Sequence, residues 1–206
     1  RRITRLSYRS DGKGFVLDKP EQIFLLQLTD SAGTPLADAK PRQLTAEPGP
    51  IGRPAFTTDG RGLLYTRRVA VDSLRAEIAT VAADVTEPAV GRTVVDTLGD
   101  AASPVMHGDT VYYVGSAFTG NDFAGHTDGL WAAALAGGAA RRLTDEQTVH
   151  VEATAGEPVV VGGRVLVAVA DRGSVGLRAG PAGGEGVALD DLPGLIGGSR
   201  VGKSFS

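Results

Sequence analysis

The sequence predicts an all-β fold, a β-propeller with about four blades of four antiparallel strands each. Two observations lead to this prediction. A turn dipeptide recurs about every 50 residues, and a short apolar run flanks each turn on both sides. The dipeptides are Asp11-Gly12, Asp59-Gly60, Gly108-Asp109 and Gly162-Gly163. A repeat of this length is typical of propeller blades, because each unit can bury its faces only against its neighbours.

Each turn joins two strand-like runs, so every unit opens with a β-hairpin. Gly and Asp tolerate the positive φ that short hairpin turns require. The runs before the turns are residues 6–8, 54–56, 104–106 and 158–161, and those after them are 14–17, 63–65, 111–114 and 165–169.

A second hairpin follows the first in every unit, which brings the unit to four strands. Its two strands are predicted at 23–28 and 42–45, at 77–81 and 92–96, at 130–135 and 141–144, and at 174–178 and 187–189. The second and fourth units are the more degenerate copies.

The repeat frame sets the boundaries of the expected blades. They are 1–49, 50–99, 100–150 and 151–198, and residues 199–206 are expected to start a further blade, with Phe205 in its first strand. We therefore expect an incomplete arc of a propeller with about six to eight blades, and a four-bladed ring is the alternative. The chain opens with Arg1-Arg2 and has Met106 as its only methionine, so we expect a piece of a longer protein.

Two stretches have some helical character, and both are better explained as strands. Residues 131–140 are rich in Ala, but Gly137-Gly138 would break a helix there. Residues 73–83 are short and contain several β-branched side chains, which favour strands.

Composition excludes several classes of protein. The net charge of −3 and the absence of a basic cluster argue against a nucleic-acid partner. The chain has no Cys, which excludes disulfide scaffolds, thiol catalysis, iron–sulfur clusters and thiolate zinc sites. No apolar run reaches the roughly 20 residues that span a bilayer, so no membrane association is expected. We expect no cofactor and a cytoplasmic location.

Several phrases resemble the propeller of the prolyl oligopeptidase family of serine peptidases, nearest to its acylaminoacyl-peptidase-like branch. They are ITRLSYRSDGKGF at 3–15, PRQLT at 41–45, PAFTTDGR at 54–61 and RRLT at 141–144, and the segments 120–131 and 171–177 match in position. TolB-like propellers share the individual phrases, so the order and spacing carry the resemblance. The family usually has Asp-Gly where this chain has Gly108-Asp109 and Gly162-Gly163.

The resemblance implies a function. In that family the propeller covers an α/β-hydrolase domain that carries the catalytic Ser, Asp and His, and it admits short peptides while excluding folded proteins. The hydrolase domain follows the propeller and is expected to be absent from these 206 residues. The expected partners are that domain of the same parent chain, of a bacterial peptidase, and a peptide or acyl-peptide substrate. The alternative is a stand-alone TolB-like propeller that acts as a protein-binding or scaffold module.

The chain itself is expected to hold no catalytic, cofactor or metal residue. The nucleophile elbow Gly-x-Ser-x-Gly is missing, and the nearest string, Arg172-Gly173-Ser174-Val175-Gly176, lies between two expected strands. Residues 197–204 (GGSRVGKS) fit the P-loop pattern, but only Phe205 and Ser206 follow where a phosphate-binding helix would begin. The segment 190–196 before it is interpreted as a loop rather than a buried strand.

The remaining polar candidates are interpreted as structural. His107, His126 and His150 lack the close spacing of zinc ligands, and Asn121, Asp122 and Asp128 lack that of an EF-hand. The pairs Arg67-Arg68 and Arg141-Arg142 are interpreted as charged, solvated strand ends that discourage unwanted strand pairing. Tyr8, Phe56 and Trp131 are expected in the blade core. The open ends of an arc suggest self-association through blade edges.

Overall fold

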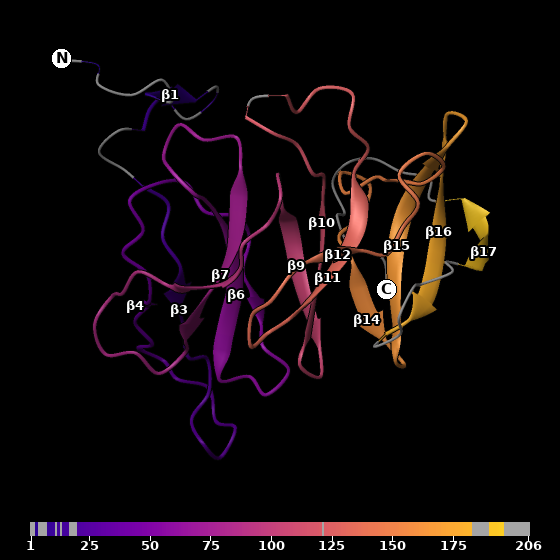
Figure 1. Cartoon of the computed structure of the whole chain (residues 1–206). Coiled ribbons are helices and arrows are strands. Elements are labelled where there is room, and N and C mark those ends of the chain that lie inside the picture. Colours follow the sequence, from indigo (N-terminus) through magenta and orange to yellow (C-terminus); the bar gives the residue numbers. More distant parts are fainter. Residues whose placement is uncertain are drawn as a thin grey trace.

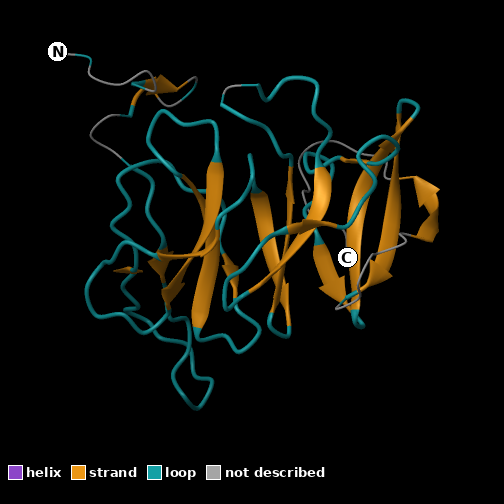
Figure 2. Ribbon diagram, viewed as in Figure 1, coloured by secondary structure: helices purple, strands orange, loops and turns teal. Residues whose placement is uncertain are grey.

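The structure is a computed structural model that describes residues 3, 8–10, 12, 14–16, 20–120, 122–182 and 190–195. These residues form strands, turns and loops, and none of them lies in a helix, as Figure 2 shows. The all-β prediction is therefore confirmed. Within the described ranges there is accordingly no helix with the length and apolarity that crossing a bilayer requires.

Each strand of the first unit has two residues, whereas the later units also contain strands of six to eight residues. In chain order the strands are β1 (Arg9–Ser10), β2 (Gly14–Phe15), β3 (Phe24–Leu25), β4 (Arg42–Gln43), β5 (Ala55–Phe56), β6 (Gly62–Arg68), β7 (Ala76–Ala82), β8 (Arg92–Val95), β9 (Ala102–His107), β10 (Thr110–Gly115), β11 (Gly129–Ala134), β12 (Arg141–Arg142), β13 (His150–Val151), β14 (Val159–Val161), β15 (Arg164–Asp171), β16 (Ser174–Pro181) and β17 (Asp190–Leu195).

Successive units form separate antiparallel sheets that stand side by side in chain order (Figure 1). The second sheet runs β5-β6-β7-β8 and the third runs β9-β10-β11-β12, each a meander of neighbouring strands. The fourth sheet contains β14-β15-β16-β17, and β13 pairs with β15 beyond the end of β14. The first strands of the three later sheets lie side by side, because β9 contacts both β5 and β14. They form the inner edge of the arrangement.

The first unit differs from the predicted four-stranded blade. Its described residues form two separate two-stranded sheets, β1-β2 and β3-β4. In the run expected at 23–28 the strand is limited to Phe24 and Leu25, which face Gln43 and Arg42. The Ile23 and Leu28 carbonyls accept from the Leu44 and Leu36 N–H groups. A loop that is closed by hydrogen bonds from the backbone to Asp30 occupies the next residues.

The interpretation of 190–196 as a loop is wrong, because residues 190–195 form β17. Their local sequence, with Pro and Gly, has little strand propensity. The pairing comes from the exposed edge of β16, where Ala179 faces Asp190 and Arg178 faces Asp191, with a register shift further along. Two ion pairs, Arg164–Asp190 at 2.8 Å and Arg178–Asp191 at 2.6 Å, accompany the pairing.

Neither stretch with helical character forms a helix, and each contains a strand, as predicted. Residues 76–82 form β7, and β11 ends before Gly137 and Gly138, which have φ values of 104° and 130°. The turn between β15 and β16 likewise needs positive φ, which Arg172 and Gly173 adopt at 47° and 85°. Two consecutive residues with positive φ are characteristic of a type I′ turn, whose twist matches that of the two strands in a hairpin.

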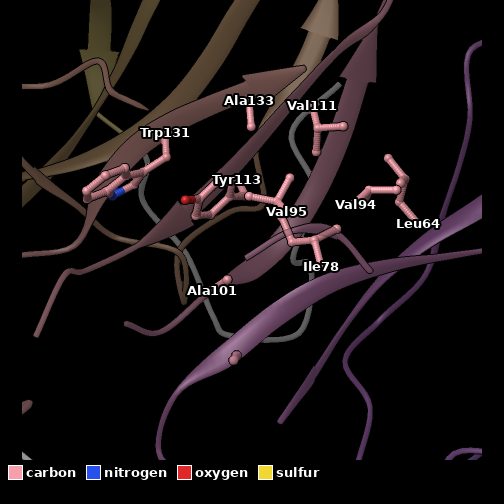
Figure 3. Close-up of a cluster of buried hydrophobic side chains, with 10 residues drawn as sticks. Leu64, Ile78, Val94, Val95, Ala101, Val111, Tyr113, Trp131 and Ala133 are labelled. Carbon is pink, nitrogen blue, oxygen red and sulfur yellow. The ribbon is translucent and has the colours of Figure 1, made fainter. Parts of the chain in front are cut away.

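The cores lie between the sheets and are built by alternation along the strands. In β10, Val111 and Tyr113 belong to the core shared with the second sheet, while Tyr112 and Val114 belong to the core shared with the fourth. Figure 3 shows the first of these cores. Burying one large apolar side chain contributes about 1.5–3 kcal/mol. The strand β10 therefore stabilises two interfaces at once.

The expected aromatic core is only partly realised. Trp131 is buried, stacks on Tyr113 with ring centroids 6.2 Å apart, and donates from Nε1 to the Gly115 carbonyl at 2.8 Å. Phe56 is 55% exposed, so its prediction as a core residue is wrong. It lies opposite Leu63 near the end of the short inner strand β5, where only β6 flanks it within the sheet.

A matched pair of leucines tests the location of the core. Leu64 is fully buried between the second and third sheets, whereas Leu98 is 59% exposed. Leu64→Ala should lower the free energy of unfolding by about 2–5 kcal/mol, since it leaves a cavity in a packed interface. Leu98→Ala should change it by no more than about 0.5 kcal/mol. Urea denaturation measures both, and equal losses would contradict the assigned core.

Candidate functional site

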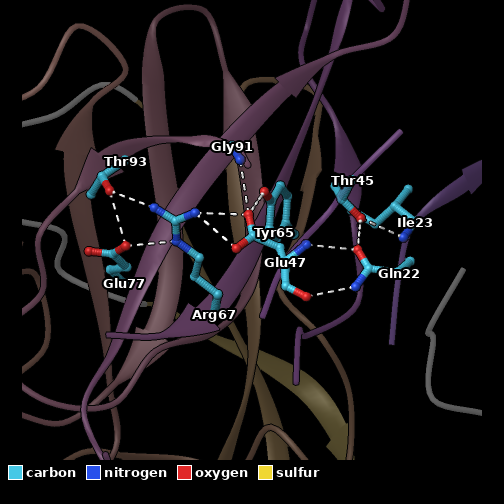
Figure 4. A network of polar contacts seen from close by, with 9 residues as sticks. All are labelled: Gln22, Ile23, Thr45, Glu47, Tyr65, Arg67, Glu77, Gly91 and Thr93. Atoms are coloured by element: carbon cyan, nitrogen blue, oxygen red, sulfur yellow. Dashed lines mark hydrogen bonds and ion pairs between the residues drawn. The ribbon is translucent and has the colours of Figure 1, made fainter. Parts of the chain in front are cut away.

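A polar network centred on Glu47 lies at the junction of the first unit and the second sheet (Figure 4). Glu47 belongs to the connection between β4 and β5, and its side chain is 2% exposed. Its carboxylate accepts hydrogen bonds from Tyr65 Oη at 2.5 Å and from the Gly91 N–H at 2.9 Å. A Cβ at position 91 would collide with the Tyr65 hydroxyl, so glycine is required there. These bonds compensate for the burial of the carboxylate.

Arg67 joins two carboxylates in this network. Its Nη1 lies 2.8 and 3.0 Å from the two Glu47 oxygens, and its Nε lies 2.7 Å from Glu77 Oε1. Thr93 Oγ1 accepts from Arg67 Nη2 and donates to Glu77 Oε1, each at 3.0 Å. Burial by itself would lower the pKa of Arg67, but the bonds to Glu77 and Glu47 raise it overall, so the guanidinium stays charged.

The Glu47 carboxylate also changes the pKa of Tyr65. Burial raises the pKa of the Tyr65 hydroxyl, and the hydrogen bond to Glu47 raises it further. The phenol is therefore neutral and acts as a donor, which excludes it as a base at ordinary pH.

A third arm connects the network to the first unit. Gln22 bonds the Glu47 backbone twice, accepting from its N–H at 2.9 Å and donating to its carbonyl at 2.8 Å. Thr45 Oγ1 donates to Gln22 Oε1 at 2.8 Å and accepts from the Ile23 N–H at 2.9 Å. The arrangement thus ties the short strand β3 to the chain segment that enters the second sheet.

A pocket of about 240 Å³ lies beside this network. Its polar wall is formed by Glu47, Arg67 and Glu77, and its apolar wall includes Val69 and Val90. The polar groups of the wall already bond one another, so the pocket offers a ligand little that is unsatisfied. We conclude that the network has a structural role, joining the first unit to the second sheet.

A second polar cluster brings together a serine, an aspartate and a histidine. Ser116, which follows β10, hydrogen bonds to the side chain of Asp128, which precedes β11. The Asp128 backbone N–H donates to His150 Nδ1 at 3.2 Å. In a catalytic relay a carboxylate orients that nitrogen and the serine bonds the imidazole. Here the backbone occupies the nitrogen and the serine bonds the carboxylate, so the cluster lacks the geometry of a relay.

An ion pair connects two sheets that are not neighbours. Arg53 Nη1 lies 3.1 Å from Glu157 Oε1, and these residues shortly precede β5 and β14. Because β9 lies between β5 and β14, this ion pair joins the second and fourth sheets across the first strand of the third sheet.

An open groove of about 650 Å³ lies between the second and third sheets at the opposite end of their strands. The hairpin turns line it, and its charged groups are Asp59, Arg61, Arg92 and Asp109. Thr58 Oγ1 donates to the Gly108 carbonyl at 3.2 Å, which links the two turns across the groove.

The structure locates most of the candidates from sequence. Ser174 lies at the start of β16, where its hydroxyl donates to the Asp171 carbonyl at 2.7 Å. His107 ends β9, and His126 Nδ1 lies 3.8 Å from Glu146 Oε1. Asn121 and the P-loop-like segment 197–204 lie outside the described residues, as does the further blade expected at 199–206. The described residues contain no group of three or more His, Asp or Glu that could hold a metal ion.

The interpretation of the arginine pairs as solvated strand ends is wrong for one member of each pair. The Arg67 side chain is 14% exposed and that of Arg142 is 12% exposed. Arg142 donates to the Thr127 and Thr144 carbonyls, both at 3.0 Å, and lies 6.0 Å from the centroid of the Trp131 ring. The groups that bond Arg67 and Arg142 are distant in the sequence or belong to the backbone. The Arg-Arg pairs in the sequence therefore do not predict these contacts.

Comparison with solved structures identifies the fold. A putative TolB from Agrobacterium tumefaciens matches with a TM-score of 0.53 and 18% identity over 75% of this chain and 54% of that chain. A puromycin-hydrolyzing peptidase from Mycobacterium tuberculosis matches with a TM-score of 0.53 and 16% identity, over 74% and 24% of the two chains. TolB from Acinetobacter baumannii matches with a TM-score of 0.50 and 16% identity, over 80% and 36%.

These similarities confirm the predicted β-propeller fold. The chain spans about half the length of the first of these proteins and about a quarter of the second. No protein-family model and no curated protein matches the sequence.

Removing the cation of the buried network tests its structural role. Arg67→Met should lower the free energy of unfolding by about 3–5 kcal/mol, because Glu47 is left buried without its charged partner. The neighbouring Arg68 pairs with Asp100 at 3.2 Å, with 34% and 47% of the two side chains exposed. Arg68→Met should cost only about 0–1 kcal/mol. Similar losses for the two variants in chemical denaturation would contradict the structural role of the network.

The Asp128 cluster predicts a pH dependence of stability. Burial raises the pKa of the Asp128 carboxyl above its usual 3.8, and the negative charge of Asp100 adds to this, while His150, Ser116 and Arg142 oppose it. The folded state therefore binds more protons than the unfolded state between 3.8 and the raised pKa. The free energy of unfolding that Asp128 contributes falls as pH rises through that window. The stability of the wild type minus that of Asp128→Asn should decrease there, and a difference that increases with pH would be the wrong sign.

Proposed function

We propose that the chain is the propeller part of a cytoplasmic, bacterial serine peptidase of the prolyl oligopeptidase type. In this role it admits short peptides or acyl-peptides to a catalytic domain located elsewhere in the parent protein and excludes folded proteins. The chain itself cleaves nothing. Its partners are that domain and the peptide, and no nucleic acid or membrane is involved.

The observation that carries the proposal is that the repeated phrases occupy equivalent places in a propeller. In the phrases QLT at 43–45 and RLT at 142–144, the threonine hydroxyl accepts from a backbone N–H at the start of the third strand, from Ile23 at 2.9 Å and from Leu130 at 3.1 Å. The residue before each Leu donates to the carbonyl of that threonine, from Gln43 at 2.7 Å and from Arg142 at 3.0 Å. The two copies of this phrase, which form part of the resemblance to the peptidase family, thus occupy equivalent positions in two blades.

The size of the match also supports the proposal. The match to this chain covers about a quarter of the puromycin-hydrolyzing peptidase. A unit of this size can therefore belong to a peptidase whose remaining chain performs the chemistry.

The alternative is a stand-alone TolB-like module that binds other proteins. It is favoured by the match to the Agrobacterium protein, of which the chain covers 54%. A module of that kind should bind a folded partner through its surface and should have no affinity for short peptides.

A short acyl-peptide distinguishes the two proposals. We expect a pentapeptide whose N-terminus carries a fluorescent acyl group to bind the chain, as measured by fluorescence anisotropy. We also expect that a chromogenic acyl-peptide is not hydrolysed by the chain. Absence of peptide binding at millimolar concentration would contradict the peptidase proposal. Turnover that a serine-directed phosphonate abolishes would reveal a nucleophile within the chain.

We further propose that the exposed apolar face of the first unit self-associates. Phe24, Leu26 and Leu28 are 56%, 44% and 67% exposed, whereas Leu25 and the preceding Ile23 pack toward the second sheet. Three apolar side chains on one face of an extended segment favour contact with a second copy.

Light scattering measures this association. The mass should rise with concentration for the wild type and stay at the monomer for the double variant Phe24→Lys, Leu28→Lys. The control is Phe123→Lys, which changes an equally exposed residue in the loop that follows β10. A wild type that is monomeric at every concentration would exclude this face as a contact.

A further inference from the structure

The second and third sheets each have a bulge on the inner edge that contains an x-Pro pair, and in the fourth sheet an x-Pro pair directly precedes β14. The pairs are Arg53-Pro54, Ser103-Pro104 and Glu157-Pro158. In the second sheet Ile51 faces Arg67 and Ala55 faces Leu64, so three residues stand opposite two. In the third sheet the register shifts opposite Ser103, which has a positive φ of 49°. A bulge redirects the side chain that it carries away from the regular alternation of the strand.

We refer to Arg53, Ser103 and Glu157 as the inner rim. Arg53 and Glu157 form the 3.1 Å ion pair between the second and fourth sheets, and Ser103 belongs to the sheet between them. The side chains of the pair are 60% and 30% exposed. The rim therefore presents one positive and one negative charge to solvent beside the inner strands.

An ion pair with this exposure is easily exchanged. Water screens the attraction between the two charges, and ordering two long side chains opposes it, so such pairs contribute little stability. Arg53 is the more open partner, and its planar guanidinium matches a carboxylate with two parallel hydrogen bonds. A carboxylate from a ligand can therefore take the place of Glu157 at little cost.

We propose that Arg53 binds the C-terminal carboxylate of a short peptide or acyl-peptide in place of Glu157. This inference rests on the proposed function and identifies what the inner rim recognises. An acyl-peptide with neutral side chains carries one charge, the C-terminal carboxylate, so the rim cation binds the only charged group that the ligand offers. Glu157 is the internal competitor that a peptide must displace.

The test compares two peptides that differ in one charge. An alanine-glycine pentapeptide, acylated at its N-terminus with a fluorescent dye, is prepared as the C-terminal acid and as the C-terminal amide. The acid should bind the wild type about tenfold more tightly than the amide, because a hydrogen bond to a charged group is lost in the amide. Arg53→Gln should remove that preference and leave binding of the amide unchanged.

The variant Glu157→Gln tests whether Glu157 competes with the ligand for Arg53. If the ion pair had only a structural role, this variant would not tighten binding of the acid. Removing the competitor should tighten binding of the acid by about threefold and leave binding of the amide unchanged. The control is Arg61→Gln, which removes an exposed arginine at the opposite end of the second sheet and should alter neither peptide. Thermal unfolding of each variant verifies that it is folded.

The outcomes separate this inference from the proposed function. If the acid and the amide bind with equal affinity, or if Glu157→Gln weakens binding of the acid, the role of Arg53 is overturned while peptide admission stands. If neither peptide binds the wild type or Glu157→Gln, the proposed function fails and this inference fails with it.

Discussion

Adjacent side chains of the second strand in the second and third sheets lie in different hydrophobic cores. Tyr112 packs toward the fourth sheet and Tyr113 toward the second, and in β6 Leu63 and Leu64 divide in the same manner. A strand with both faces buried has no tolerance for a shift by one residue, because such a shift would exchange the two sets of side chains. This constraint fixes the register of β6 and β10 and determines which sheet packs against each of their faces.

Polar groups add what the apolar cores cannot provide, namely a defined connection between units. The hydrophobic contact between β3 and the second sheet involves few residues, since β3 has only two. The bonds that Glu47 makes with Tyr65 and Arg67, and those that Gln22 makes with the Glu47 backbone, are directional and allow one arrangement. At the inner edge the exposed pair of Arg53 and Glu157 has the opposite character, because it stabilises little and can open. The buried network around Glu47 therefore has a structural role, whereas the exposed pair of Arg53 and Glu157 is suited to exchange with a ligand.

The sequence was informative wherever the signal was local. The hairpin turns and the strands beside them, such as β6 and β10, were predicted because turn residues and alternation are properties of neighbouring positions. The strand β17 was missed since its pairing depends on the edge of β16 and not on its own composition. The bonds of Arg67 to Glu47 and Glu77, and the pair Arg53–Glu157, join residues from different parts of the chain, so no spacing pattern marks them. The exposure of Phe56 was missed for a related reason, because alternation shows the face on which a side chain lies but not whether another element covers it.

The propeller fold is established by these sheets and by the comparison with solved structures, and the peptidase role is the step that remains to be tested. The reading frame of the parent gene beyond the codon for Ser206 tests it most directly. The account predicts that the frame continues through further blades into a Gly-x-Ser-x-Gly motif, with an Asp and a His downstream. A frame that ends soon after completing the propeller would contradict the account and leave the protein-binding module in its place.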